Sequence, residues 1–327
     1  MRILGLQGSP RKKGNTRFLL DLFLEKAQEH GAHTRVVHVD ERHILPCKEY
    51  TVCEKKGFCP IDDDMKKEIY ALLREAEAVI LATPIFFYNT TAQLKALIDR
   101  CQTLWARKYK LHLTDPGQKY RKGVLLALGA TKGTNLFEGM KLTAKYFFDA
   151  IGADFSGSLT YPRIEHPGDM EKHPTVHEDV KTAVQSLVSD FAGRRRILFA
   201  CRENACRSQM AAAFTQCHAG DKIAVISAGT RPAPAPDPMM IRAMQEKGID
   251  MGFRKTRQLD DGIESLNPEV IVTMGCGEEC PFLPGVMRQD WDLPDPVGQS
   301  LDVMREIRDK IEKRVISLIK EVSGGIL

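Results

Sequence analysis

The sequence predicts an α/β fold with two doubly wound parallel-sheet domains, one after the other along the chain. Three observations predict it. Short apolar runs alternate with amphipathic helical segments throughout the sequence. The chain has 327 residues, which exceeds one ordinary domain of about 100–200 residues. The strand–loop–helix pattern that opens the chain begins again just after Gly193. We therefore expect domains at residues 1–193 and 196–327.

The first half carries the elements of one parallel sheet. Short runs rich in apolar residues predict strands at Ile3–Gln7, Val36–Val39, Ala78–Ala82, Val124–Leu128 and Phe155–Leu159. Helical spacing of apolar residues predicts helices at Thr16–Glu29, Met65–Ala76, Thr91–Arg107, Phe137–Ile151 and Val176–Phe191. Parallel strands need such crossover helices, so the alternation predicts a doubly wound sheet.

The second half repeats the pattern in a smaller unit. Strands are expected at Ile197–Ala200, Ile223–Ser227 and Val270–Met274. Helices are expected at Ser208–His218, Pro238–Lys247 and about Leu301–Val322. The two halves share their strand–loop–helix opening, and beyond this opening the sequence shows no internal repeat.

Composition excludes several classes of function. The 47 basic and 43 acidic residues give a net charge of +4, without the basic footprint usual for nucleic-acid binding. No apolar run approaches the roughly 18 residues that a membrane helix needs. The N-terminal residues do not form a signal peptide, and nine cysteines without one suit a reducing compartment. We expect a cytoplasmic protein that binds neither nucleic acid nor a membrane.

Residues 197–210, ILFACRENACRSQM, form the most informative stretch of the chain. An apolar strand ends at Cys201, Arg207 follows six positions later, and a helix opens behind it. Backbone N–H groups and the helix dipole make such a loop an anion cradle, which would hold the thiol as a thiolate. The stretch therefore predicts a nucleophile facing a bound oxyanion.

Two downstream features can join this chemistry. Asp295 lies in WDLPDP, where a proline-fixed turn could hold a general acid or could simply be a turn. Cys276 and Cys280 follow the strand Val270–Met274 and are four positions apart. They could share a helix face, form a disulfide or take part in a zinc site, although no second cysteine pair lies at zinc-finger spacing.

The first half opens with a loop suited to phosphate. In residues 8–16, GSPRKKGNT, hydroxyl, amide, guanidinium and backbone groups can surround an anion, although a solvated basic turn fits the composition equally well. Its position at the end of the first strand favours ligand binding. A second loop, Thr83–Asn89, carries three consecutive aromatic residues that suit a planar ligand.

The first half resembles the flavodoxin-like, FMN-dependent NAD(P)H oxidoreductases in GSPRKKGNT, in DDDM at Asp62–Met65 and in the stretch Thr83–Arg100. The resemblance covers about residues 1–190 and implies FMN, with NAD(P)H as electron donor. The implied phosphate ligands are Ser9, Arg11, Gly14, Asn15 and Thr16. The isoalloxazine would lie near Thr83, Pro84, Ile85, Phe86 and Phe87, with the Gly129–Gly133 loop beside it.

Some members of this family carry three closely spaced cysteines that contribute to a four-iron cluster. Here Tyr50 stands at the middle position between Cys47 and Cys53, and Cys59 follows. A cubane cluster normally needs four thiolates, and this stretch supplies three. We therefore expect no iron–sulfur cluster here, and interpret these thiols as part of a cap or a dimer loop.

The second half resembles the low-molecular-weight tyrosine phosphatase fold and, within it, the thiol-relay arsenate reductases. The matching stretches are residues 201–210, 227–230 (SAGT), 272–285 and 291–296. The resemblance implies that Cys201, Arg207 and Asp295 act on arsenate and that Cys276 and Cys280 complete a relay. It also implies the residues that bind the oxyanion, which are Asn204, Ala205, Cys206 and Ser208. Some of these reductases carry a glutamate for potassium where Ala211–Ala213 stand, so we expect no metal there.

Two alternatives remain open from the sequence. A phosphatase would need neither Cys276 nor Cys280, and a non-catalytic thiol protein would bind arsenite or soft metals through its cysteines. The fusion suggests that the flavin half supplies the electrons in place of thioredoxin or a small thiol; the alternative is that the two domains merely share a pathway. We also expect a homodimer formed through the flavin domain.

Overall fold

The structure is a computed structural model that describes residues 1–275 and 283–324, and the chain divides into two compact units. The first comprises Met1–His112 and Gln118–Asp190. The second comprises Leu113–Gly117 and Phe191–Leu327, so a five-residue segment from the first half of the sequence belongs with the second unit. The expected domain ranges of 1–193 and 196–327 remain a prediction.

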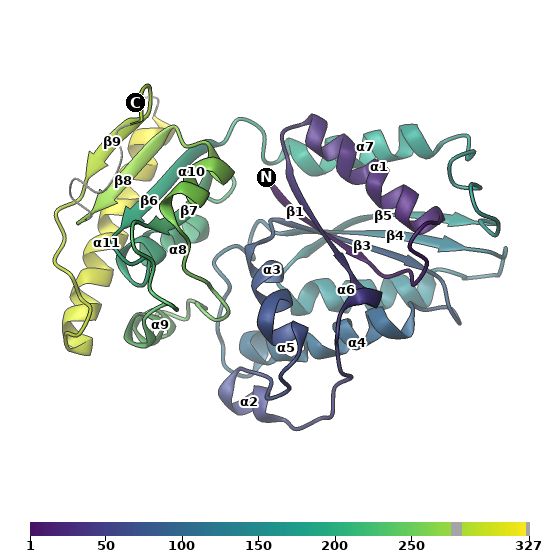
Figure 1. Ribbon diagram of the computed structural model, residues 1–327, viewed down its shortest axis with the longest axis horizontal. Coiled ribbons are helices and arrows are strands. Elements are labelled where there is room, and N and C mark those ends of the chain that lie inside the picture. The colour runs from purple at the N-terminus through teal and green to yellow at the C-terminus, as the bar shows by residue number, and fades with distance from the viewer. Residues whose placement is uncertain (276–282, 325–327) are drawn as a thin grey trace. The chain divides into compact units, whose positions relative to one another are not determined.

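The first unit is built on a five-stranded parallel sheet, which confirms the expected fold class (Figure 1). Its order is β2-β1-β3-β4-β5, the flavodoxin-like arrangement. The strands are β1 (Arg2–Gln7), β2 (His33–His38), β3 (Ala78–Pro84), β4 (Lys122–Gly129) and β5 (Asp154–Pro162). The order reverses at β1, so ligands are expected where β1 and β3 end.

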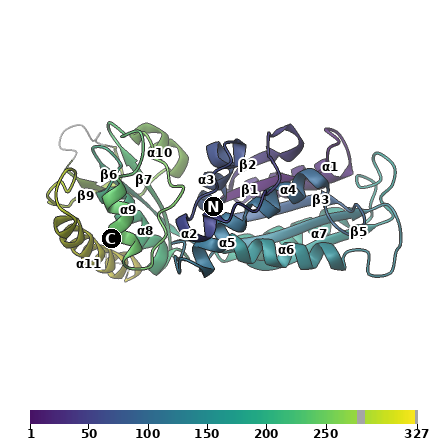
Figure 2. The ribbon, with the colours of Figure 1, turned by 90° about the horizontal axis from the view of Figure 1, so that it is seen from below.

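Helices cover both faces of this sheet. One face is covered by α1 (Asn15–Glu29) and α7 (Val176–Ser189), whose buried residues share a core with β1, β3 and β4 (Figure 1). The other face carries α3 (Tyr70–Glu75), α4 (Ala92–Arg100), α5 (Gln102–Tyr109) and α6 (Glu138–Ala150). Figure 2, seen from below, shows α4, α5 and α6 in front of the strands.

Several expected elements differ in detail. The helix expected at Met65–Ala76 begins as a π-helix, η2 (Met65–Ile69), before α3. The helix expected at Thr91–Arg107 is interrupted at Cys101, which is fully buried between α4 and α5. The short elements η1 (Val39–Glu41) and α2 (Val52–Lys56) were not expected, because neither has enough residues to show a period.

The second unit is built on a four-stranded parallel sheet in the order β7-β6-β8-β9. Its strands are β6 (Arg195–Cys201), β7 (Ile223–Gly229), β8 (Val270–Met274) and β9 (Met287–Asp290). Strand β9 was not expected, because its sequence MRQD has no apolar run that would predict a strand. It is mostly exposed, and its pairing with β8 defines it. Again the order reverses at the first strand, here β6.

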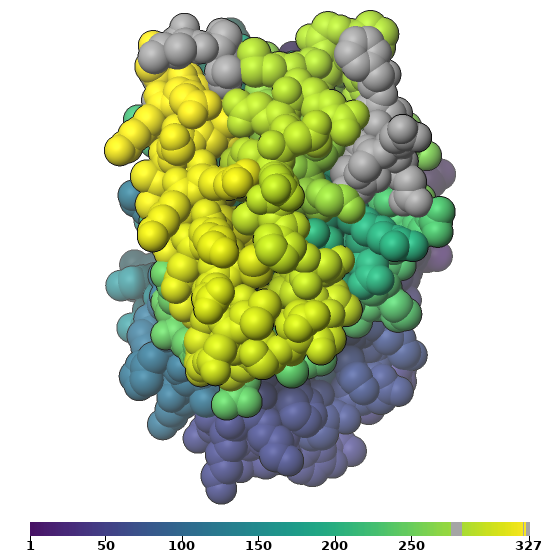
Figure 3. All heavy atoms as spheres, turned by 90° about the vertical axis from the view of Figure 1, so that its left-hand side faces the viewer, coloured from purple at the N-terminus to yellow at the C-terminus, as the bar shows by residue number. Residues whose placement is uncertain are grey.

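The helices of the second unit also lie on both faces of its sheet. On one face, α8 (Arg207–Ala219), α9 (Pro238–Gln245) and α11 (Leu301–Ser323) enclose the larger core. On the other, α10 (Leu259–Leu266) packs on β6 and β7. Figure 3 shows α11, in yellow, on the surface of this unit. None of the described helices is both long and apolar enough to span a membrane.

Candidate functional site

Cys201 is the last residue of β6, at the point where the strand order of the second sheet reverses. Its parallel neighbours in register are Gly229 at the end of β7 and Met274 at the end of β8. The side chain of Cys201 is buried in the crevice where open α/β sheets bind their ligands. The structure therefore places the expected nucleophile where a ligand is expected.

In the loop after Cys201, the carbonyl oxygens accept hydrogen bonds from the segment that follows β7. The carbonyls of Cys201, Arg202, Glu203 and Ala205 accept hydrogen bonds from the backbone N–H groups of Thr230, Arg231, Ala233 and Asp237. Among the described residues, no hydrogen bond uses the backbone N–H groups of residues 202–206. Helix α8 begins directly behind at Arg207 without a side-chain cap. This arrangement is that of an anion cradle.

The Cys201 sulfur has one polar partner within the loop. Its Sγ lies 3.0 Å from Ser208 Oγ, and Asn204 Nδ2 donates to the same hydroxyl oxygen at 2.8 Å. Asn204 donates to the hydroxyl oxygen, and the Ser208 hydroxyl can donate its own proton to the sulfur when Cys201 is a thiolate. The arrangement can stabilise a thiolate.

Asn204 holds the loop in shape. Its backbone is left-handed, with φ of 51°, and its side chain is fully buried. The Oδ1 atom accepts from the Arg257 backbone N–H at 2.9 Å and from Gln209 at 3.3 Å. The contact with Arg257 was not predicted, because it joins residues 53 positions apart that only the fold brings together.

Arg207 and Asp295 meet as expected of a cation and a general acid in one site. Arg207 Nη2 lies 2.6 Å from Asp295 Oδ2, and Nη1 donates to the Leu293 carbonyl at 3.0 Å. Asp295 also accepts from the Val297 N–H, so it forms the turn and pairs with the arginine. The guanidinium lies against Gly275, where an added Cβ would come within 2.7 Å of Nη1.

Of the other expected oxyanion-loop residues, Ala205 and Cys206 are buried. Burial raises the pKa of the Cys206 thiol, and the charges of Asp237 and Cys201 raise it further. Cys206 is therefore a poor candidate for a second nucleophile. Cys276 and Cys280 lie outside the described residues.

In the first unit, the phosphate loop and the loop after β3 line one cavity of about 240 Å³. It lies at the reversal point between β1 and β3. Eight of the ten expected flavin residues line it: Ser9, Arg11, Gly14, Asn15, Thr16, Pro84, Ile85 and Phe86. Ala130, from the expected Gly129–Gly133 loop, also lines it. Helix α1 begins at this cavity with Gly14 as N-cap and no side-chain cap, which leaves N–H groups for an anion.

For three of the expected flavin residues, the side chain is buried, exposed or already hydrogen-bonded. Thr83 is fully buried, and its hydroxyl lies 2.7 Å from that of Thr90, so it supports the loop from beneath. Phe87 is fully exposed in a left-handed conformation. The Asn15 amide, although at the cavity, bonds to the His166 carbonyl and the Met170 N–H, which leaves its backbone for a phosphate.

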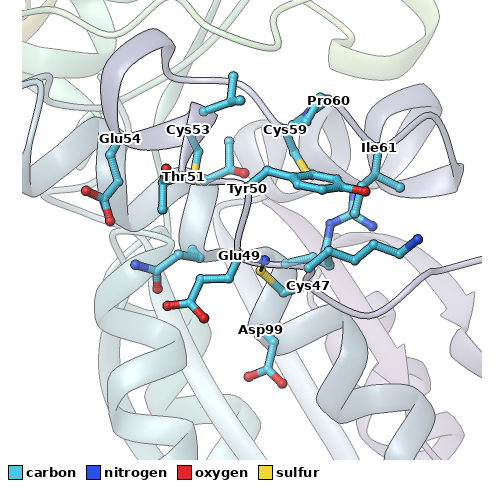
Figure 4. A pocket seen from close by; sticks show the side chains of 15 residues that line it. Cys47, Glu49, Tyr50, Thr51, Cys53, Glu54, Cys59, Pro60, Ile61 and Asp99 are labelled. Atoms are coloured by element: carbon cyan, nitrogen blue, oxygen red, sulfur yellow. Dashed lines mark hydrogen bonds between the residues drawn. The ribbon is translucent and has the colours of Figure 1, made fainter.

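A second cavity of the first unit, about 410 Å³ in volume, is lined by Cys47, Cys53 and Cys59. Figure 4 shows the three thiols around it, with the Tyr50 side chain among them. Burial raises the pKa of Cys53, and charge on Cys59 and then on Cys47 raises it further. We call this space the three-thiol cavity.

The three-thiol cavity does not fit a cubane iron–sulfur cluster. Such a cluster takes four thiolates, and Tyr50 brings a phenol instead of a fourth. Over the described residues, no three His, Cys, Asp or Glu side chains converge closely enough to hold a metal ion.

Arg100, which lines this cavity, forms a buried ion pair with Asp63. Arg100 and Asp63 have fully buried side chains, with Nη1 2.5 Å from Oδ2 and Nη2 3.2 Å from Oδ1. Burial would raise the pKa of Asp63, but hydrogen bonds from Arg100 and from the N–H groups of Leu45 and Met65 hold it below its usual value. The pair fixes the segment before Met65 to α4.

Two protein-family models match the chain, one in each half. Residues 1–134 match the family model described as NADPH-dependent FMN reductase. Residues 196–325 match the model described as low molecular weight phosphotyrosine protein phosphatase.

Individual relatives match one half each. An iron–sulfur flavoprotein of Methanosarcina thermophila is 38% identical over 132 residues, which are 40% of this chain and 65% of that protein. The glutaredoxin arsenate reductase of Synechocystis is 38% identical over 39% of this chain and 99% of its own length. A putative arsenate reductase of Halobacterium salinarum is 36% identical over 38% of this chain and 89% of its own length.

The chain thus covers 65% of the flavoprotein and nearly all of the Synechocystis reductase. Residues 196–325 match the low molecular weight phosphotyrosine protein phosphatase model, residues 1–134 match the NADPH-dependent FMN reductase model, and the chain belongs, through its second half, with the arsenate reductases.

Proposed function

We propose that this protein is an oxidoreductase that reduces arsenate to arsenite at Cys201, through a relay with Cys276 and Cys280. One observation carries the proposal: Cys201 pairs in register with Met274, the residue that precedes Gly275 and Cys276. The strand that leads into the second thiol therefore ends beside the first. A phosphatase needs no such thiol.

The second unit supplies the groups for the oxyanion step. The loop N–H groups and Arg207 would bind arsenate, and the Cys201 thiolate would attack arsenic. A sulfur–arsenic bond forms, an arsenic–oxygen bond breaks, and Asp295 protonates the departing oxygen as water. Ser208 stabilises the thiolate before the attack.

The thiol steps transfer the electrons. Cys276 attacks the Cys201 sulfur, and the electron pair of the sulfur–arsenic bond stays on arsenic, which leaves as arsenite. Cys280 then attacks Cys276, which frees Cys201 and leaves a Cys276–Cys280 disulfide. An external two-electron reductant must reduce that disulfide before the next turnover.

The first unit fits FMN. The N–H groups at the start of α1, with Ser9, Arg11 and Thr16, would hold the phosphate, while Pro84, Ile85 and Phe86 would line the ring site. When bound, FMN would supply electrons from NAD(P)H, and we propose the Cys276–Cys280 disulfide as the acceptor. Thioredoxin, glutaredoxin or a small thiol is the alternative reductant.

Serine variants test the relay. Cys201→Ser, Cys276→Ser and Cys280→Ser should each abolish steady arsenite production, whereas arsenate binding should persist in the last two. Cys217→Ser, a half-buried thiol on α8, is the matched control and should keep full activity. Full turnover by Cys276→Ser would exclude the relay.

A coupled assay tests the electron source. Purified protein with FMN, NAD(P)H and arsenate, and no added thiol, should oxidise the nicotinamide faster than without arsenate. An equal rate in the two samples would show that the flavin half does not serve the relay.

The family match also favours a second candidate, a low-molecular-weight phosphatase that hydrolyses a Cys201 phosphate. Asp295 would then act as acid and base in turn. Substantial hydrolysis of phenyl phosphate that survives loss of both Cys276 and Cys280 would favour it.

We propose two further properties, a cytoplasmic location and a homodimer formed through the flavin domain. The seven described cysteines are free thiols, as a reducing compartment requires. Leu142 and Tyr146, one turn apart on α6, and Phe87 are exposed large apolar side chains that a second copy could cover. Light scattering on the purified chain would measure its mass in solution.

A further inference from the structure

We propose that the three-thiol cavity binds arsenite, the trivalent product of the second half, through Cys47, Cys53 and Cys59. The relay proposed above does not use these residues. The inference rests on the proposed function for the identity of the ligand. Its chemistry can be measured independently of arsenate reduction.

The donor set of the cavity selects the ligand. Three thiols line it, and thiolates select soft centres. Structural zinc takes four ligands in a tetrahedron, and a cubane cluster takes four thiolates. Trivalent arsenic keeps a lone pair and makes three pyramidal bonds to sulfur. Three thiols therefore complete its coordination, whereas they leave zinc or a cluster one ligand short.

The binding step is a ligand exchange that balances without a redox partner. Three S–H bonds of the cysteines and three As–OH bonds of arsenous acid break. Three As–S bonds form, and three water molecules leave. Arsenic stays trivalent throughout, so the step needs neither oxidant nor reductant.

The three cysteines line one cavity, but among the described residues no three such side chains lie close enough to hold a metal ion, so arsenite binding requires this segment to rearrange. Two features of the segment favour such a rearrangement. Glu49 and Thr51, between the first two thiols, both have left-handed backbone, with φ of 53° and 56°. Helix α2, which carries Cys53, has only five residues and no side-chain cap. A short strained segment of this kind reorganises more readily than a long helix.

The wall of the cavity offers a donor for the bound product. Arg100 lines the cavity, is 1% exposed, and its Nε has no hydrogen-bond partner within the described part of the chain. Its charge interacts with Cys59. A buried N–H without a partner is costly, and an arsenic-bound sulfur at Cys59 would accept from it.

The test measures binding of sodium arsenite to the full-length chain that carries Cys201→Ser, Cys276→Ser and Cys280→Ser, so that the relay thiols cannot capture arsenic. After equilibrium dialysis, arsenic per chain is determined by mass spectrometry. One arsenic per chain is expected. Adding Cys53→Ser or Cys59→Ser should weaken binding at least about tenfold, because loss of even an outer-shell partner costs roughly 10–100-fold.

The matched control adds Cys217→Ser, a half-buried thiol outside the cavity, and should bind as the background protein does. Retained FMN and an unchanged circular dichroism spectrum would show that each variant is folded. Equal arsenite binding with and without Cys53 and Cys59 would overturn the proposal. Iron with acid-labile sulfide, or zinc that arsenite does not displace, in protein purified without oxygen would also overturn it.

This experiment contains no arsenate. If the second half proves to be a phosphatase, arsenite binding in the first half can still be observed. If arsenate reduction is confirmed and the cavity does not bind arsenite, only this inference fails.

Discussion

At the scale of single residues, the oxyanion loop depends on a few side chains that contact one another. Ser208 contacts the Cys201 sulfur, and Asn204 fixes the Ser208 hydroxyl while holding the loop to Arg257. Arg207 pairs with Asp295. Each contact restricts the conformations of the loop, so the groups that would bind an anion are already in position before it arrives.

Ser208→Ala should slow the reaction of Cys201 with arsenate about 10–100-fold. It removes the one polar partner of the sulfur in the loop, and a hydrogen bond to a charged group contributes roughly 1.5–3 kcal/mol. Single-turnover arsenite formation measures the effect. Thr215→Ala is the control, because this buried hydroxyl on α8 bonds only back to Ala211. Equal rates in Ser208→Ala and wild type would contradict the assignment.

Asp63→Asn should reduce the free energy of unfolding at neutral pH by about 3–5 kcal/mol, because it leaves Arg100 buried without its counter-charge. Since folding lowers the pKa of Asp63, the pair stabilises the fold above the unfolded pKa of about 3.9. That stability is lost as the pH falls below this value and through the folded pKa.

Urea unfolding at a series of pH values checks this prediction. The acid-dependent loss of stability should be smaller in Asp63→Asn than in wild type. Asp99→Asn, which removes an exposed pair with Lys95, should cost no more than about 1 kcal/mol. A wild-type profile in Asp63→Asn would contradict the prediction.

At the scale of elements, both candidate sites lie where a parallel sheet reverses its strand order. In the first unit these are the ends of β1 and β3, and in the second the ends of β6 and β8. Neighbouring strands also constrain the loops. Gly229, the last residue of β7, lies against the oxyanion loop, where an added Cβ would come within 2.8 Å of Arg202 O and Asn204 N.

Gly229→Ala should therefore displace the oxyanion loop and lower the catalytic rate by about a hundredfold, since a shift near 1 Å can cost that much. The atoms that it would meet belong to the backbone and cannot rotate away. Phosphate binding by calorimetry and arsenite formation measure the loss. Gly193→Ala adds a Cβ that meets no atom within 4 Å, and although its left-handed backbone (φ of 68°) strains the alanine locally, both measurements should stay unchanged. Normal phosphate affinity in Gly229→Ala would contradict the clash.

At the scale of the whole molecule, the chain joins a flavin unit and an oxyanion unit covalently. Because both units belong to one chain, an encounter between the flavin unit and the oxyanion unit is intramolecular, and the effective concentration of one unit for the other is often millimolar. If the flavin half serves the relay, the specific activity should therefore not depend on protein concentration.

Diluting the full-length chain about a hundredfold, with NAD(P)H, FMN and arsenate held constant and saturating, should leave turnover per chain unchanged. If turnover per chain instead falls in proportion to the protein concentration, electrons pass between separate chains or through a diffusing carrier. A chain carrying Cys276→Ser sets the background rate of nicotinamide oxidation.

Prediction from sequence succeeded where local chemistry determines structure. The apolar strands and the loop after Cys201 could be predicted from residue composition and spacing. It missed β9, because MRQD carries no apolar run, and it did not assign the helix α10. It also treated Thr91–Arg107 as one helix, although the chain breaks at Cys101.

The sequence by itself determined that two α/β units follow one another and that a thiol ends one strand before an anion loop. These properties depend on residues close together in the chain, whose periodicity and spacing are visible directly. Tertiary structure alone decided that Leu293 and Asp295 orient Arg207, and that three cysteines line one cavity beside a buried arginine. Such contacts join residues distant in sequence, and only the packing of the sheets and helices brings them together.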